Sequence, residues 1–390
     1  MKWKFYSLAF VAGMSILTAC SSDDNNDNDG NGGNGNGNEI ENGTILKGTI
    51  TSDVTLAAGN TYKLSGEYIV EEGATLHIEE GVKIIAVYDD IADYILVKQG
   101  GKINAVGTPD KPIVMTSEKE EPGAWGGIHI CGRAHTNAEG GKGSSEIGGA
   151  VYGGNDDADN SGTLQYIRLE YTGFAFDEEH EANGISFYGV GNGTIVDHCQ
   201  AYKGSDDGFE FFGGSVNVSN LVAVSCSDDS FDWTEGWNGK GPNLVAYQEA
   251  ESTLGYDCDC LMECDNNGSN NAATPVAHPV LKNLILVGNG GSKQGIRLRA
   301  GTEVEIDNAK VCGKGQPLTV ETALTENALK NGTSKLTNIT LTSELSSKEG
   351  IYTHADFIAV TSNKVDANLS YSSFEDIRKE CSWMNGSWVK

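Results

Sequence analysis

Apolar and polar residues alternate in short runs over most of the chain. Four segments illustrate the pattern: GISFYG (184–189), GFEFFG (208–213), SFDWTE (230–235) and GIRLRA (295–300). In each of them an apolar side chain occupies every second position, as in a β-strand with one buried face. The chain has 51 glycines and 7 prolines in 390 residues, which favours many tight turns between short strands. The sequence therefore predicts an all-β protein.

These strands recur at a fixed spacing. The phrase Ser-Asp-Asp-x-Phe-acid-aromatic begins at Ser205 and again at Ser227, 22 residues later. The segments that start at 194 and 216 align without a gap, and looser matches start at 163, 279 and 302. A unit of this size cannot bury its apolar face alone, so successive units must stack. The repeat predicts a right-handed single-stranded parallel β-helix, because the L-x-x-L-x-L consensus of the alternative, a leucine-rich repeat, is missing.

The repeat is predicted to form a coil over residues 44–315, followed by C-terminal rungs and an irregular cap over 316–390. Within the cap, the segment ETALTENALKNG predicts a short helix closed by Gly332, and Ser373 marks the expected start of another. Such an end is needed because the last turn of an open coil would otherwise expose unpaired strand edges.

Strand alternation divides the four aligned segments into an inner and an outer face. The predicted core positions are Ile185, Phe187, Phe209, Phe211, Phe231, Trp233, Ile296 and Leu298. The predicted outer positions form two columns, Ser186, Glu210, Asp232, Arg297 and Tyr188, Phe212, Thr234, Arg299. We interpret six of these outer residues as a candidate ligand-binding face with two exposed rings: Tyr188, Glu210, Phe212, Asp232, Arg297 and Arg299.

The repeated aspartates should stack at one corner of the coil. Like charges about 5 Å apart repel by roughly 1 kcal/mol in water, and by more where solvent is excluded. Asp206, Asp207, Asp228 and Asp229 must therefore extend into water, bind turn amides, hold a proton or share a cation. A calcium ion is the candidate cation, since it bonds oxygen ligands at about 2.3 to 2.6 Å.

The charge balance limits the partners. The formal net charge is −28 at pH 7, which argues against nucleic acid or an anionic membrane surface as a ligand. Neutral or cationic ligands and metal ions suit this charge better.

The N-terminus reads as an export signal with a tether. Residues 1–19 combine Lys2 and Lys4 with an apolar stretch, which is typical of a secretory signal. Residues 20–43 begin with an acidic, Gly/Asn-rich run that favours a flexible tether. Leu17-Thr-Ala-Cys20 is similar to a bacterial lipobox, which implies acylation of Cys20 and anchoring in the outer membrane, with the body facing the cell exterior or the periplasm.

Eight cysteines remain after Cys20: Cys131, Cys199, Cys226, Cys258, Cys260, Cys264, Cys312 and Cys381. The cluster from Cys258 to Cys264 has the density of a zinc site, but no histidine stands at ligand spacing. In an oxidising compartment disulfides are the favoured interpretation, with the connectivity left open.

From about Thr44 to Lys390 the chain resembles an uncharacterised group of secreted or lipid-anchored bacterial proteins with the pectate-lyase-like β-helix fold. The segments EEGATLHIEEGVKI, GGKINAVGTPDKPIVMTS, AWGGIHICGRA and YGGNDDADNSGTLQYIRLEYTG carry this resemblance, together with the Asp-Asp rungs. The motifs point to the fold and to no particular reaction.

Three functions follow from these features. The first is non-catalytic binding of a polysaccharide on the outer face. The second is a glycoside hydrolase or polysaccharide lyase that uses the Asp-Asp rungs, in which Arg297 or Arg299 could act as a lyase base; the catalytic residues are otherwise unknown, and the Gly-His-Gly element of polygalacturonases is absent. The third is a passive surface adhesin or scaffold. We expect the binding function, with calcium as a possible cofactor.

Overall fold

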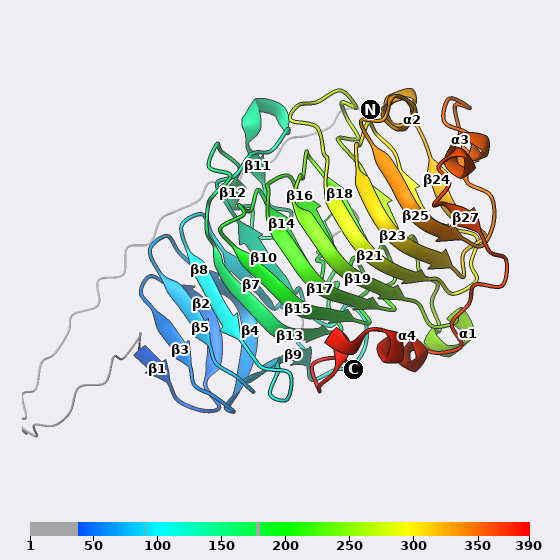
Figure 1. Cartoon of the computed structure of the whole chain (residues 1–390). Helices are drawn as coiled ribbons and strands as arrows, with labels where there is room; N and C mark the ends of the chain where they lie inside the picture. The colour runs from blue at the N-terminus through cyan, green and yellow to red at the C-terminus, as the bar shows by residue number, and fades with distance from the viewer. Residues whose placement is uncertain (1–37, 90, 177–179) are drawn as a thin grey trace, which may run out of the picture. The chain divides into compact units, whose positions relative to one another are not determined.

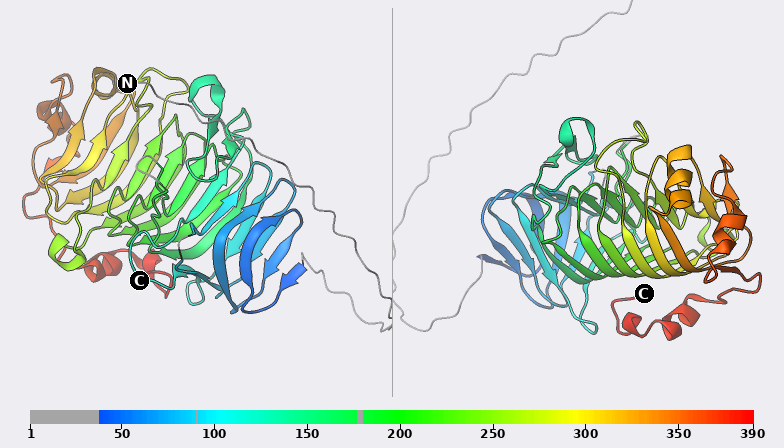
Figure 2. Two further views of the ribbon diagram at one scale, coloured as in Figure 1. Left: turned by 180° about the vertical axis from the view of Figure 1, so that it is seen from behind. Right: turned by 45° about the horizontal axis from the view of Figure 1, so that its top comes forward.

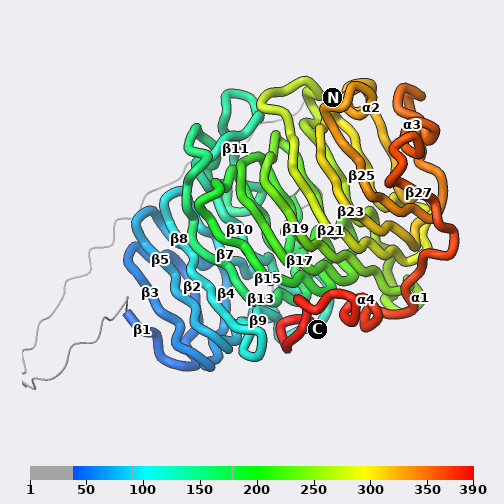
Figure 3. Tube along the Cα trace, viewed as in Figure 1, coloured from blue at the N-terminus to red at the C-terminus, as the bar shows by residue number. Residues whose placement is uncertain are grey.

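The strands of the chain wind into a coil. The computed structural model describes residues 38–89, 91–176 and 180–390. Among the named strands of this part, all pairs are parallel except β11 (Gly143–Ser144) with β12 (Val151–Tyr152). Successive turns lie side by side (Figure 1, Figure 3). The right-handed parallel β-helix predicted from the repeat is confirmed.

Each turn contributes strands to three parallel stacks, which we name A, B and C. Stack A begins with β1 (Asn38–Ile40), β3 (Val54–Leu56), β5 (Thr75–Ile78) and β8 (Lys102–Val106). Stack B begins with β2 (Ile45–Ile50), β4 (Thr61–Val70), β6 (Lys83–Ala86) and β9 (Ile113–Ser117). Strands β2 and β4 also extend into stack C.

Later turns follow the same plan with longer strands. Seven longer strands each serve two stacks, with the first half in stack A and the second half in stack B. They are β13 (Gly162–Glu170), β15 (Ile195–Tyr202), β17 (Asn217–Val224), β19 (Lys240–Tyr247), β21 (Val280–Val287), β23 (Glu305–Cys312) and β25 (Lys335–Leu341). Stack B ends with β27 (Lys364–Val365). Stack C continues through β7 (Tyr94–Val97), β10 (Ile128–Cys131), β14 (Ile185–Tyr188), β16 (Phe209–Phe212), β18 (Phe231–Thr234), β20 (Met262–Cys264), β22 (Gln294–Leu298), β24 (Gln316–Val320) and β26 (Ser346–Ser347).

An asparagine column marks the bend between stacks A and B. Asn220, Asn243, Asn283 and Asn308 have φ between 55° and 63°, a left-handed conformation that asparagine tolerates better than most residues. Their amides form a ladder, in which each Nδ2 donates to the Oδ1 of the preceding asparagine at 2.8, 3.0 and 2.8 Å. We call these four residues the asparagine ladder.

The interior of the coil holds the predicted core. All eight predicted inner side chains are buried. Phe187 stacks on Phe211 with ring centroids 5.0 Å apart, and Phe209 stacks on Phe231 at 5.7 Å. Burial of a side chain of this size contributes about 1.5–3 kcal/mol, so the aromatic repeat holds successive turns in register.

Two predicted helices are confirmed near the C-terminus. Helix α2 (Ala323–Asn331) ends at Gly332, whose φ of 84° closes it, and α4 (Phe374–Glu380) follows Ser373. Three further short elements are α1 (Glu251–Leu254), α3 (His354–Ala359) and the 3₁₀ turn η1 (Glu139–Gly141).

The last residues form a strap along the outside of the coil. This C-terminal strap, residues 366–390, contains α4 and the 3₁₀ turn η2 (Ser382–Met384). Its Ile377, Met384 and Trp388 pack with outward-facing residues of the long strands, including Val222 and Ile285. Figure 2 shows α4 running across these strands. The strap therefore covers an apolar stripe that the strands would otherwise expose.

The expected disulfides are absent. All eight cysteines from Cys131 to Cys381 lie in the described part of the chain, and each is buried and unpaired. Cys199, Cys226 and Cys264 belong to the central core, where a thiol packs as a small apolar group. Burial raises the pKa of the Cys226 thiol to about 12. The disulfide prediction was wrong: three of the cysteines fill core positions of the repeat, and Cys131, Cys312 and Cys381 pack as thiols in the apolar clusters outside it.

Candidate functional site

The strand register places a column of polar side chains on the outer face of stack C. Ser186 pairs with Glu210, Glu210 with Asp232, and Asp232 with Glu263. Glu263 then pairs with Arg297. Because the residues on either side of each of these point into the core, the column must face outward. We call Glu210, Asp232 and Glu263 the acidic column.

The second outer column differs from its prediction. Tyr188 and Phe212 are stacked with centroids 4.4 Å apart, but their relative exposures are only 0% and 7%. Hairpin β11–β12 covers them, with the Tyr152 ring 5.1 Å from that of Tyr188. The expected exposure of both rings was wrong, because the insertion between β10 and β13 folds onto this part of the face.

The two predicted arginines lie at the far end of the same face and are engaged in ion pairs. Arg297 contacts Glu263 at 2.8 Å and Glu321 at 3.2 Å. Arg299 contacts Asp265 at 2.7 Å and also pairs with Glu263. These contacts raise the pKa of Arg297 against the opposing effect of burial. Both guanidinium groups therefore stay charged and fixed in orientation.

The Asp-Asp corners stack as the repeat predicts, and the two members of each pair differ in role. The Oδ1 of Asp207 accepts a hydrogen bond from the backbone N–H of Asp229 at 2.8 Å. The Oδ1 of Asp229 in turn accepts from the N–H of Cys260 at 2.6 Å. The second aspartate of each pair thus binds a turn amide of the next rung, and Asp206 and Asp228 precede it along the corner.

Carboxylates from the corner and from the column converge. Oxygen atoms of Asp207, Glu210 and Asp232 all lie within 4.8 Å of one another, and so do those of Asp229, Asp232 and Glu263. A third such group joins Asp206 and Asp207 to Asp228. All four predicted metal ligands therefore take part in such groups.

This crowding raises the proton affinity of the carboxyl groups. Burial, and then the charge of Asp228, raise the pKa of Asp206 to about 7. Burial, and then Glu146 and Asp232, raise the pKa of Glu210 well above its ordinary range. One oxygen of Asp232, Oδ1, is buried without a hydrogen-bond partner. The face therefore holds acceptors that its own residues do not satisfy.

The sequence did not reveal several members of this site. Glu263 lies on β20 and Asp265 directly follows that strand. The rung between Asp232 and Glu263 has 31 residues and the next has 34, so the repeat alone did not align them. The alternation Leu-Met-Glu-Cys-Asp (261–265) was the available signal. Asn183, which donates to Glu210 Oε2 at 2.6 Å, and Glu146, which accepts from Tyr188, come from loops without a repeat signature.

The chain can be compared with known proteins. A family model described as a pectate-lyase like beta helix domain matches residues 48–389. The chain belongs to this family. Its match spans nearly all of the coil and the C-terminal strap, and no curated protein matches the chain.

The chain also matches a solved structure. The crystal structure of the Dettilon tailspike protein (gp208) matches with a TM-score of 0.31 and 8% sequence identity, over 76% of this chain and 56% of the tailspike chain. The chain thus spans little more than half the length of that protein.

The N-terminal predictions concern other residues. The signal, the lipobox and Cys20 lie outside the residues that the structure describes. Among the described residues, no helix has the length and apolar character needed to cross a bilayer.

Proposed function

We propose that the protein binds a polysaccharide along the outer face of stack C without cleaving it. The observation that carries the proposal is the register, which repeats an outward polar side chain on consecutive rungs from Glu210 to Arg297. Rungs are separated by the strand spacing of about 4.8 Å. A row of this kind offers the same hydrogen-bonding groups to successive units of a linear polymer.

The chemistry of the row suits hydroxyl groups. Ionised carboxylates accept hydrogen bonds from hydroxyls, whereas the arginines donate. Because Tyr188 and Phe212 are covered, polar contacts and not ring stacking carry the binding.

Calcium fits the same face as a cofactor. The converging groups consist of carboxylate oxygens, the ligands that calcium prefers, and Asp232 Oδ1 has no other partner. Asp207, Glu210 and Asp232 would hold one ion, and Asp229 with Glu263 would complete a neighbouring site. A bound ion would neutralise adjacent carboxylates and accept sugar oxygens as further ligands.

Cleavage is the second candidate, favoured by the raised pKa of carboxyl groups such as Asp206. The carboxyl groups that converge within 4.8 Å are closer together than the pair of an inverting hydrolase, which stands about 6.5–9.5 Å apart. A lyase would need a neutral base, and the ion pairs of Arg297 and Arg299 keep both protonated. These features favour binding over reaction.

The proposed location rests on the sequence. A lipid on Cys20 would anchor the protein in the outer membrane, and the acidic tether would let the coil face the cell exterior. Radiolabelled palmitate should enter the wild-type protein and not the Cys20→Ala variant. Protease digestion of intact cells should remove the coil, whereas protection of the coil would contradict surface exposure.

Calorimetric titration with a panel of neutral and charged polysaccharides, with and without calcium, tests the binding. We expect saturable heat without new reducing or unsaturated ends. The double variant Glu210→Gln, Asp232→Asn should lower the affinity for the polysaccharide about tenfold or more. Glu305→Gln, on the outer face of β23, is the matched control and should bind as wild type. Product formation would favour the enzyme, and no heat with any polysaccharide would favour the scaffold.

A further inference from the structure

A second, separate groove lies on the outer face of stack A. It has a volume of about 480 Å³ and crosses the first halves of β15, β17, β19 and β21, within the range of about 300–1,000 Å³ that ligand pockets occupy. Its apolar surface comes from Ile195, Pro242 and Val280. Ile195 is 52% exposed. Because its side chain faces away from the core, it does not contribute to core packing.

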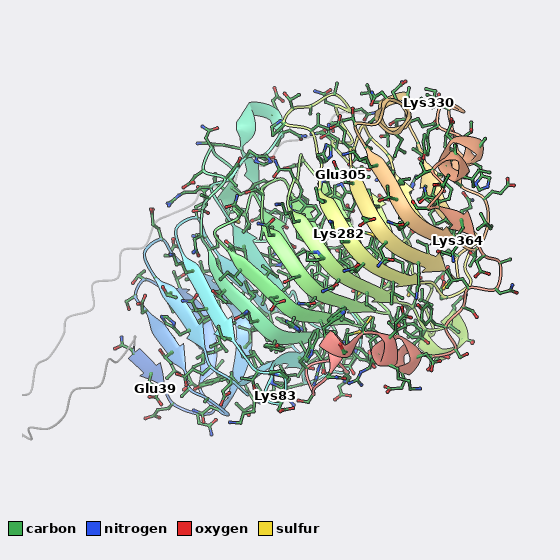
Figure 4. The ribbon with its side chains drawn as sticks, viewed as in Figure 1. Glu39, Lys83, Lys282, Glu305, Lys330 and Lys364 are labelled. Carbon is green, nitrogen blue, oxygen red and sulfur yellow. The ribbon has the colours of Figure 1, made fainter. Side chains whose placement is uncertain are left out.

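The rim of the groove carries two lysines. Lys240 and Lys282 are both exposed and both line it. Lys240 pairs with Val280 in the register, and Lys282 pairs with Pro242, so the two ammonium groups flank the apolar surface from adjacent rungs. Figure 4 shows Lys282 on the outside of this sheet. Within the described residues, neither lysine forms an ion pair.

The carboxylates near these lysines already have partners. Asp197 accepts from Ser219 and Asn220, both at 2.7 Å, and also pairs with His198. On the next rung beyond Lys282, Glu305 pairs with Lys335 at 2.7 Å.

The remaining neighbour is Asp307, which stands beside Lys282 in the register. It accepts hydrogen bonds from Thr337 at 2.8 Å and from Asn338 at 2.6 Å. Neither lysine is therefore in direct contact with a carboxylate of the described residues, although hydrogen bonds, helped by the charge of Lys282, lower the pKa of Glu305 and of Asp307.

From this arrangement we propose that the groove is a second glycan site, which binds a sugar acid such as a uronate unit. The apolar surface takes the C–H face of a pyranose ring, and the ammonium groups take its carboxylate. On the same lining, Asn192 supplies an amide for sugar hydroxyls, and the oxygen of Ser219, which donates its proton to Asp197, can accept from one. An acidic peptide could pair with the lysines, but it would not offer a pyranose ring to the apolar surface or a set of hydroxyl groups to the polar side chains.

The overall charge of −28 does not prevent this binding. Charges separated by more than about 8 Å are largely screened at physiological ionic strength, whereas the two lysines act at contact distance. The protein would thus bind neutral or cation-bridged sugar units on stack C and acidic units on stack A.

The test is calorimetric titration of the full chain with a galacturonic acid trisaccharide and with the neutral galactose trisaccharide, at low and high salt. We expect saturable binding of the acidic probe that salt weakens, whereas any binding of the neutral probe, which belongs to stack C, should not depend on Lys240 and Lys282. The double variant Lys240→Gln, Lys282→Gln should weaken acidic binding about tenfold or more, and Ile195→Asp should do the same.

Two controls separate this site from the acidic column. Lys83→Gln, at an exposed lysine of β6, should bind the acidic probe as wild type does. The variant Glu210→Gln, Asp232→Asn should do so as well when calcium is withheld, because no cation then bridges the probe to stack C. Failure of the acidic probe to bind, an equal loss of neutral-probe binding in the lysine variant, or loss of acidic binding in the Glu210/Asp232 variant instead of the lysine variant would overturn the proposal. None of these results would by itself contradict polysaccharide binding on stack C.

Discussion

The asparagine ladder and the acidic column are two rows of polar residues stacked on consecutive rungs of the same coil. In the ladder the two inner amides both donate and accept, so that Asn243 donates to Asn220 and accepts from Asn283. In the acidic column every ionised group is an acceptor, and Asp232 Oδ1 has no partner. The ladder is built from its own donors and acceptors, whereas the column draws its donors from Asn183 and the two arginines and still leaves one oxygen of Asp232 unpartnered.

The difference separates a structural row from a functional one. Stacked amides lower the free energy of the fold, because each added rung completes a hydrogen bond of about 1 kcal/mol. Stacked carboxylates raise it by like-charge repulsion and by desolvation. A row of carboxylates that destabilises the fold is expected on an outer face where a bound ligand offsets the destabilisation. Three experiments can test the difference between the ladder and the column.

The largest effect should come from interrupting the ladder. Asn243→Ala removes a hydrogen bond on each side and places alanine at φ 63°. We expect the free energy of unfolding to fall by about 3 kcal/mol, measured by urea denaturation. Asn238→Ala, at an exposed asparagine outside the ladder, should change it by less than about 0.5 kcal/mol. Equal effects of the two variants would show that the ladder adds no stability.

The pH dependence should reveal the cost of the acidic groups. Burial, and then neighbouring carboxylates, raise the pKa of Asp206 to about 7 and that of Asp228 to about 6, whereas aspartate in an unfolded chain titrates near about 3.9. Between these values the folded protein binds more protons than the unfolded chain, so stability falls as pH rises.

We expect the free energy of unfolding in chelator to drop by about 1–3 kcal/mol from pH 5 to pH 8. Asp206→Asn should flatten this profile, and Asp110→Asn, at an exposed residue away from the column, should not. Stability that stays level or rises with pH would contradict the assignment of raised pKa values to these groups.

The smallest effect is expected from converting one position of the column to the chemistry of the ladder. Asp232→Asn removes a charge from between Glu210 and Glu263 and adds a donor. At pH 8 we expect a gain of about 1 kcal/mol in the free energy of unfolding. The reverse exchange, Asn243→Asp, should be destabilising. A loss of stability in Asp232→Asn would mean that the native carboxylate is already compensated within the protein.

Regular rungs were predictable from the sequence, and insertions were not. The alternation around Phe209 and Phe231 fixed both the core stack and the outward direction of Glu210 and Asp232, because the strand period is a local property. Glu263 escaped notice because the rung leading to it is longer. The burial of Tyr188 depends on where a distant hairpin folds, which no local pattern encodes. Glycan binding, calcium and the lipid anchor remain predictions.

The C-terminal strap changes how the coil can come apart. In a solenoid each rung touches only its neighbours, which permits fraying from either end. Here Ser387 donates its backbone N–H to Pro109 at 2.8 Å and accepts from Arg168, and Lys390 reaches Glu170 at 3.1 Å. The last residues to be synthesised thereby bind to turns that were made far earlier. The strap can dock only when those turns have formed, and unfolding of the C-terminal end should be coupled to unfolding of the middle of the coil.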